Sequence, residues 1–280
     1  MSAINTISID KCLRLVGTPN CPALIDVRPD DQFATDPHLI PSAIRRPADH
    51  VTEWSREFAN QSVIVICQSG AVESPGVAAW LRAAGTPADV LEGGMKEWRG
   101  AKLALVPETR LSKRDTQGRT IWVTRARPKV DRIACPWLIR RFVDPHAVFL
   151  YVASNEVMRT AVQFGGAPFD IENDDVFWSH RGERCTFDVM METLGLAPFD
   201  ALKRLAIIVR GADTGQPHIV PEAAGLLAAS LGLSRMFADD LEQLEAGMLL
   251  YDSFYRWCRD ATDETHNWTS HKVVKPKAKT

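Results

Sequence analysis

The first hundred residues alternate short apolar runs with a clear helical segment. The runs Ala23–Val27, Ser62–Cys67 and Ala88–Gly94 are mostly apolar, which is typical of buried strands. Pro75–Gly85 has apolar residues at helical spacing, a proline at its start and a glycine at its end. Strand, helix and strand in this order favour parallel pairing. We therefore expect an α/β unit with a parallel sheet and flanking helices.

The pattern changes after residue 120, where two strand signals give way to mostly helical periodicity. Thr120–Arg125 and Ala147–Ala153 predict strands, and Asp131–Asp144 predicts a helix that breaks or begins near Pro136. From Glu156 onward, helical segments dominate. The last of them, residues 238–260, is expected to bury one face that carries Leu241, Leu244, Met248, Tyr251 and Tyr255. We expect a mixed α+β, helix-rich second unit.

The polar stretch 107–120 separates these two patterns and is nearly devoid of large apolar side chains. We therefore divide the chain into an N-terminal unit (1–106), a basic linker (107–120), a C-terminal unit (121–270) and a basic tail (271–280).

The composition is that of a globular protein, with 45% hydrophobic and 24% charged residues among 280. No apolar run approaches the roughly 20 residues of a membrane helix, and the first residues lack the basic and apolar regions of a signal peptide. We expect a cytoplasmic protein with no membrane partner. The six cysteines form no CxxC pair, so we expect reduced thiols.

Positive charge is concentrated in the middle of the chain. Residues 110–141 carry ten Lys or Arg and two Asp, although the net charge of the whole chain is −2. The guanidinium groups of this block suit a tetrahedral dianion such as chromate or sulfate, and they also suit the DNA phosphates that a regulator binds. A solvated surface is the alternative, and no helix-turn-helix or basic zipper pattern is visible. The candidate anion ligands are Arg125, Arg127, Arg132, Arg140 and Arg141.

Cys67 stands at the carboxyl end of a predicted strand and is followed by a glycine-containing loop and a helix. Backbone N–H groups of such a loop, together with the helix N-terminus, favour the thiolate, which is the nucleophilic form. The alternative is that Cys67 is simply the last buried residue of a strand. The candidate loop residues are Gln68, Ser69, Gly70, Ala71, Val72, Glu73 and Ser74.

Residues 20–106 resemble a rhodanese domain. The ordered segments that carry the resemblance are LIDVRPDDQF (Leu24–Phe33), HLIPSAIRRP (His38–Pro47), VIVICQSG (Val63–Gly70), AAWLRAAG (Ala78–Gly85) and VLEGGMKEW (Val90–Trp98). The resemblance implies a sulfurtransferase in which Cys67 takes a sulfane sulfur from a donor such as thiosulfate. The resulting persulfide passes its sulfur to a thiol acceptor, and no cofactor is required. Asp26 and Arg28 are expected to support the site structurally.

The loop departs from the CxxGxRS pattern of many rhodaneses, because Val72 and Glu73 stand where an arginine is common. A carboxylate near the thiol disfavours both the thiolate and an anionic donor. A rhodanese unit that only binds is therefore the alternative to a catalytic one. Phosphatase chemistry on the same fold is disfavoured for the same reason, since it needs an arginine in this part of the loop.

Residues 121–260 resemble the C-terminal domain of the chromate-resistance (ChrB-type) proteins. The segments that carry the resemblance are WVTRARPKVDRIACPWLIRRFVDP (Trp122–Pro145), PFDIENDDVFWSHRGERCTFDVM (Pro168–Met190), IVRGADTG (Ile208–Gly215), PEAAGLLAASLGLS (Pro221–Ser234) and YDSFYRWCRD (Tyr251–Asp260). The resemblance implies sulfur transfer linked to chromate or oxyanion resistance. One alternative is a non-catalytic chromate-responsive sensor or DNA-binding regulator, and another is a metal-dependent redox-stress protein.

Several polar residues of the second unit are candidates for a divalent metal site. Imidazole, thiolate and carboxylate groups on separate elements can converge on a transition metal. The alternative is a set of buried hydrogen-bonded groups, such as Arg210 paired with Asp170. Asp131 and Cys135 are four residues apart and should share one helical face. The candidate ligands are His180, Cys185, Asp213 and Asp252.

Overall fold

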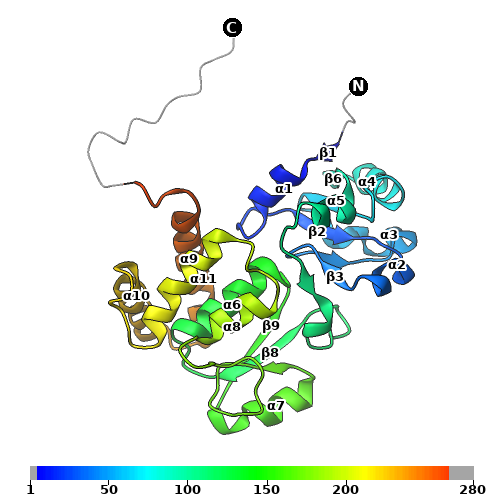
Figure 1. Ribbon diagram of the computed structural model, residues 1–280. Coiled ribbons are helices and arrows are strands. Elements are labelled where there is room, and N and C mark those ends of the chain that lie inside the picture. Colours follow the sequence, from blue (N-terminus) through cyan, green and yellow to red (C-terminus); the bar gives the residue numbers. More distant parts are fainter. Residues whose placement is uncertain (1–4, 265–280) are drawn as a thin grey trace.

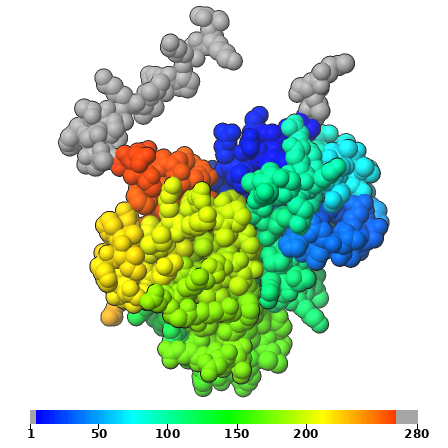
Figure 2. All heavy atoms as spheres, in the orientation of Figure 1, coloured from blue at the N-terminus to red at the C-terminus, as the bar shows by residue number. Residues whose placement is uncertain are grey.

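The computed structural model describes residues 5–264, which form two units that lie side by side (Figures 1 and 2). The N-terminal unit is blue to cyan, and the C-terminal unit is green to orange. The predicted tail 271–280 and the last residues of the predicted C-terminal unit lie outside the described residues.

A five-stranded parallel sheet is the centre of the N-terminal unit. Its strands, in spatial order, are β1 (Thr6–Ile7), β6 (Ala88–Leu91), β5 (Val63–Ile66), β2 (Ala23–Asp26) and β4 (Ile44–Arg45). The helices around it are α1 (Ile9–Leu15), α2 (Asp30–Thr35), η1 (Ala48–His50), α3 (Val51–Trp54), η2 (Ser55–Phe58), α4 (Glu73–Ala83) and α5 (Gly94–Gly100). The predicted α/β architecture is confirmed.

The apolar run of β5 explains why this sheet is covered on both faces. Ile64 and Ile66 belong to one buried cluster, whereas Val63 and Val65 belong to another. Successive side chains of a strand point to opposite faces, so a strand that is apolar at every position must be covered on both sides.

The predicted linker, residues 107–120, is folded against its neighbours. It begins at β7 (Val106–Pro107), which pairs antiparallel with β3 (His38–Leu39), and continues through η3 (Glu108–Arg110). Arg114 then forms ion pairs with Glu108 and Asp144. The connection is therefore held to both units.

The C-terminal unit contains a three-stranded parallel sheet and a larger set of helices. The strands, in spatial order, are β10 (Ala167–Pro168), β8 (Ile121–Arg125) and β9 (Val148–Val152). The helices are α6 (Val130–Phe142), η4 (Ser154–Glu156), α7 (Val157–Phe164), α8 (Thr186–Thr193), α9 (Asp200–Asp213), α10 (Glu222–Met236) and α11 (Asp240–Asp260). The helix-rich character is as expected, and the molecule is α/β overall.

Helix α6 continues through Pro136, so the expected break near that residue is wrong. Proline has no N–H to donate to the carbonyl four residues earlier. That carbonyl belongs to Arg132, and it accepts a hydrogen bond from the Tyr151 hydroxyl of β9 at 2.9 Å. The strand thus supplies the donor that the proline lacks.

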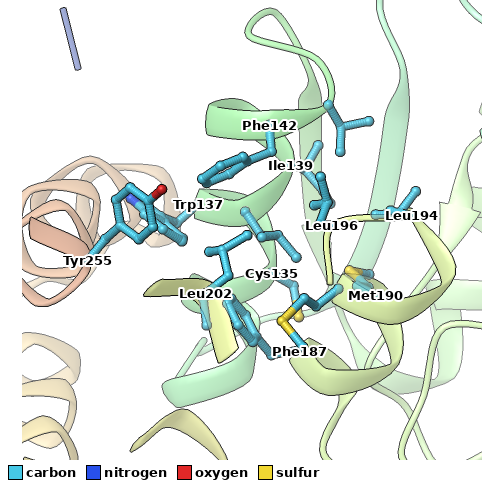
Figure 3. Close-up of a cluster of buried hydrophobic side chains, with 14 of the residues drawn as sticks. Cys135, Trp137, Ile139, Phe142, Phe187, Met190, Leu194, Leu196, Leu202 and Tyr255 are labelled. Carbon is cyan, nitrogen blue, oxygen red and sulfur yellow. The ribbon is translucent and has the colours of Figure 1, made fainter. Parts of the chain in front are cut away.

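Buried aromatic and aliphatic side chains join α6, α8, α9 and α11 into one core (Figure 3). Trp137 and Phe142 of α6 lie against Tyr255 of α11, with ring centroids 5.5 Å apart in each pair. The predicted buried face of α11 is correct except at Leu241, which is half exposed because it lies in the first turn.

The two units share part of this core. Buried residues of the first unit, among them Cys12 and Val16, belong to the same cluster as Phe142. The backbone N–H of Ser42 donates to the carbonyl of Phe142 at 2.7 Å. Among the described residues, no helix combines the length and apolar character that crossing a bilayer requires.

Candidate active-site loop and a carboxylate–histidine cluster

Cys67 follows β5 at the carboxyl edge of the five-stranded sheet, in the centre of its strand order. Its side chain is buried, and helix α4 begins at Glu73 after the loop that Cys67 opens. In parallel α/β sheets this edge is where ligands bind. The structure thus places Cys67 at the carboxyl end of a strand, as the sequence predicts.

The loop surrounds the sulfur with hydrogen-bond donors. The Sγ of Cys67 lies 3.1 Å from the Oγ of Ser74. Burial raises the pKa of the Cys67 thiol, but the hydroxyl of Ser74 and the backbone N–H groups of Ser74, Val72 and Ser69 lower it more. The net result is a pKa below the ordinary value, so a larger fraction of this thiol is ionised at neutral pH than of an ordinary cysteine.

Tight backbone contacts hold this loop against the start of α5. The N–H of Met95 donates to the carbonyl of Cys67, and the N–H of Lys96 donates to the carbonyl of Gln68, both at 3.0 Å. A Cβ on Gly94 would lie 2.3 Å from the carbonyl oxygen of Cys67, and the residue has a φ of +56°. Only glycine allows this approach in that conformation.

The outer side of the loop carries no arginine. Val72 is 72% exposed, and Gln68, Ser69 and Ala71 are exposed as well. Glu73 is the first residue of α4. The Ser74 hydroxyl and the backbone N–H groups of the loop lower the pKa of Cys67 without any arginine.

Asp26 and Arg28, the predicted support residues, form a buried ion pair beside this edge. The Nε and Nη2 atoms of Arg28 donate to the carboxylate of Asp26 at 2.6–3.0 Å. Arg28 also donates to the carbonyls of Asp36 and His38. The pair therefore fixes the chain between β2 and β3.

A cavity of about 480 Å³ opens at the same sheet edge, beyond the end of β2. Val27 lines it, and the N–H of Val27 donates to the carbonyl of Ile66, which directly precedes Cys67. Arg45 and Arg46 also line the cavity. Sequence reasoning missed both arginines, although Arg45 ends a short strand and Arg46 follows it directly, which is a usable signal.

The five predicted anion ligands do not form one site. Arg127 donates to the carbonyls of Ser234 and Phe237. Arg140 is paired with Glu245, and Arg141 is paired with Asp252. These three guanidinium groups are engaged by the protein itself. Arg125 and Arg132 line a cavity of about 540 Å³ in the C-terminal unit, together with Lys129.

That cavity contains a cluster of one histidine and three aspartates. The Nε2 atom of His180 lies 3.2 Å from Asp213, 3.4 Å from Asp170 and 3.6 Å from Asp131. We call Asp131, Asp170, His180 and Asp213 the carboxylate–histidine cluster. Its members come from α6, the segment after β10, the loop before α8 and the end of α9.

The parallel sheet explains how residues so distant in sequence meet. Strands β8 and β10 pair in parallel, so the segments that follow them leave from the same edge. Asp131 follows β8 and Asp170 follows β10. The N–H of Asp170 donates to the carbonyl of Trp178, and this contact brings His180 back beside Asp170.

The electrostatics of the cluster are dominated by crowded negative charge. Burial, Asp213 and Asp170 raise the pKa of Asp131 well above its usual range. Hydrogen bonds to Asp170 and Asp213 raise the pKa of His180 to about 10. Burial raises the pKa of Asp170, but His180, Thr186 and Arg132 lower it more.

The predicted metal ligands are therefore corrected in part. Asp252 is not in the cluster, since it accepts hydrogen bonds from Trp137 and Arg141 in the helical core. Cys185 caps α8, and burial and the charge of Asp131 raise the pKa of its thiol well above normal. Its side chain also hydrogen-bonds to Asp131 of the cluster, so its role as a metal ligand stays a prediction.

Asp170 was missed as a ligand, and Asp131 was noted in the metal-site argument without being named as a ligand. Asp131 was placed on a helical face with Cys135, and both are buried on α6. Asp170 was considered only as the partner of an arginine, and the arginine that pairs with it is Arg132. Asp170 lies two residues after the short strand β10, and that position was the available signal for it.

Two family models match separate parts of the chain. Residues 8–101 match the model of the rhodanese-like domain, and residues 122–258 match the model described as ChrB, C-terminal domain. The chain is 35% identical over 139 residues to Protein ChrB of Cupriavidus metallidurans. That match covers 50% of this chain but only 40% of the relative.

Solved structures of rhodanese-like proteins are similar to about a third of this chain. A rhodanese-like domain protein from Staphylococcus aureus is 29% identical, with a TM-score of 0.31, over 34% of this chain and 91% of its own. A rhodanese-related protein from Thermoplasma volcanium is 21% identical, with a TM-score of 0.33, over 37% of this chain and 99% of its own.

Proposed function

Because this chain joins a rhodanese-like domain to a ChrB C-terminal domain, we propose that it is a sulfurtransferase that carries sulfur as a persulfide on Cys67. The observation that carries the proposal is the loop of N–H and hydroxyl donors that lowers the pKa of this buried thiol. A thiolate held at the ligand-binding edge of a parallel sheet is a competent nucleophile.

Sulfur transfer takes two steps, and in each step one sulfur–sulfur bond forms while another breaks. The thiolate of Cys67 attacks the outer sulfur of a sulfane donor, and the bond from that sulfur to the rest of the donor breaks. With thiosulfate, sulfite leaves with the electron pair. An acceptor thiolate then attacks the outer sulfur of the Cys67 persulfide, and Cys67 is released as a thiolate.

The loop donors have the same role in both exchanges. The N–H groups of Ser69, Val72 and Ser74 lower the pKa of the thiol, and we infer that they also stabilise the anionic persulfide. No other group needs to move a proton, since both the attacking and the leaving sulfur atoms are anions.

The exposed surface of the loop favours a donor other than thiosulfate. Val72 offers no positive charge to a dianion, and Glu73 begins α4 beside it. We infer that an organic persulfide with less negative charge is the better donor.

The test is turnover with two donors and two variants. The wild-type protein should transfer sulfur from an organic persulfide to a thiol, and Cys67→Ser should abolish transfer while the circular dichroism spectrum is unchanged. Cys21→Ser, which removes a half-buried thiol outside the loop, is the matched control and should retain activity. Full activity of Cys67→Ser would contradict the assignment.

We also propose that the sulfur chemistry belongs to a response to chromate. The support is the match of residues 122–258 to the ChrB C-terminal domain. A cell that lacks this protein should become more sensitive to chromate, and the wild-type chain should restore growth. Equal rescue by Cys67→Ser would show that the chromate role does not depend on sulfur transfer.

A further inference from the structure

The carboxylate–histidine cluster places more acceptors around one nitrogen than a proton can satisfy. An imidazole Nε2 has a single N–H, which points at one acceptor. Here oxygen atoms of three carboxylates lie within 3.2–3.6 Å of that atom. A single cation between these atoms would contact all of them.

A buried oxygen without a partner points to the same conclusion. Asp131 is 1% exposed and lines the cavity, and its Oδ1 atom has no hydrogen-bond partner. A buried carboxylate oxygen in that state is energetically unfavourable. It is explained when an ion that is not part of the polypeptide binds there.

The other oxygens of the cluster are already held in place. Asp131 Oδ2 accepts from the N–H of Phe187, and Asp213 Oδ1 accepts from the N–H of Asp131, both at 3.3 Å. Asp170 Oδ2 is paired with Arg132 at 3.3 Å. Such outer partners orient the ligands of metal sites. The backbone of Asp170 has a φ of +50°, a strained conformation of the kind found at functional sites.

We propose that the carboxylate–histidine cluster binds one divalent transition-metal ion, with Nε2 of His180 and carboxylate oxygens of Asp131, Asp170 and Asp213 as ligands. The candidate ligand atoms of Asp131, Asp170 and His180 all lie within 4.8 Å of one another, a spacing that suits bonds of about 2.0–2.2 Å to a shared ion.

The donor set selects the class of metal. Carboxylate oxygens suit Mg²⁺ and Mn²⁺, whereas imidazole suits Fe²⁺, Zn²⁺ and other transition metals. One nitrogen with several oxygens therefore favours Mn²⁺ or Fe²⁺ over Mg²⁺. The ion faces a cavity of about 540 Å³ whose wall also carries Arg125 and Lys129. The open side of the metal would thus face positive charge, which suits an anionic ligand.

The test is a titration of the full-length protein with MnCl₂ after removal of metal by a chelator. Electron paramagnetic resonance measures free Mn²⁺, and we expect one bound ion per chain. Binding should also raise the midpoint of thermal unfolding, because the ion binds only the folded state. An equal concentration of MgCl₂ should displace little of the Mn²⁺.

Two variants and one matched control decide whether the cluster is the site. His180→Ala and Asp213→Asn change side chains that are not fully buried, and each should weaken binding by about tenfold or more. Glu172→Gln removes an exposed carboxylate from the same cavity and should change the Kd by less than about twofold.

Three results would overturn the proposal. The first is that the wild-type protein shows no saturable binding of Mn²⁺. The second is that Glu172→Gln weakens binding as much as His180→Ala, which would indicate diffuse attraction by acidic groups. The third is that folded His180→Ala and folded Asp213→Asn both bind Mn²⁺ as tightly as the wild type.

Discussion

At the scale of single residues, Ser74 is the residue whose side-chain hydroxyl lowers the pKa of the Cys67 thiol. It lies 3.1 Å from the sulfur and is buried. A hydrogen bond to a charged group contributes about 1.5–3 kcal/mol, and 1.36 kcal/mol corresponds to one pKa unit. The state of the thiol at neutral pH therefore depends strongly on this contact.

Ser74→Ala should raise the pKa of Cys67 by about one unit. The wild-type pKa is lowered, so alkylation by iodoacetamide should reach half its maximal rate below the pH typical of a free thiol, and the variant profile should shift to higher pH. Ser253→Ala, on the exposed side of α11, is the control. An unchanged profile for Ser74→Ala would show that the backbone donors suffice.

Val72 is the residue that we propose sets the preference among sulfur donors. Its side chain is 72% exposed, so an arginine at this position should be accommodated without loss of stability. Val72→Arg should raise the kcat/KM for thiosulfate by about tenfold, because a guanidinium group binds the dianion. Val162→Arg, at a remote residue that is 83% exposed, should have no effect. Equal kcat/KM in the two variants would rule out this explanation.

At the scale of elements, the contact between β9 and α6 shows how a proline is accommodated inside a helix. The hydroxyl of Tyr151 donates to the carbonyl of Arg132, which Pro136 leaves without its helical donor. This contact also fixes the first turns of α6, on which Asp131 lies. The proline therefore helps to place the cluster rather than to end the helix.

Tyr151→Phe should lower the free energy of unfolding by about 1–3 kcal/mol, because a half-buried carbonyl loses its partner. Urea denaturation measures this change. The phenylalanine ring keeps the packing, so a loss of less than about 0.5 kcal/mol would mean that water replaces the hydroxyl.

The sequence predicted most elements because their patterns are local. Local patterns alone identify the apolar strands β2, β5 and β6 and the helical spacing of α4 and α11. They can be recognised without knowing which residues pack against them. Cys67 was identified for the same reason, since the strand, loop and helix that position it are contiguous. In the carboxylate–histidine cluster, His180 and Asp213 were named as candidate ligands. Asp131 and Asp170 were not, because the four residues meet only through the pairing of β8 with β10. Asp252 was included by mistake because helical periodicity does not reveal its partners, Trp137 and Arg141.

At the scale of the whole molecule, the two units are joined by a continuous core. A Cβ on Gly17 would lie 2.2 Å from the ring of Phe142, and Arg259 donates to the carbonyl of Arg14. The strand pair β3 and β7 adds a further connection. We therefore expect the units to unfold together.

Phe142→Ala should lower the free energy of unfolding by about 3–5 kcal/mol, because the ring is fully buried at the junction of the units. In the wild type, near-UV circular dichroism and hydrogen exchange of β5 and β8 should report a single transition. Two separate transitions in the wild type would show that the shared core does not couple the units.

The most direct test of the central claim is the mass of the intact protein after incubation with a sulfane-sulfur donor. We predict a gain of one sulfur atom on Cys67 with an organic persulfide, a smaller gain with thiosulfate, and loss of the added sulfur when a thiol is supplied. The absence of an adduct on Cys67 with every donor would contradict the proposal that this protein carries sulfur.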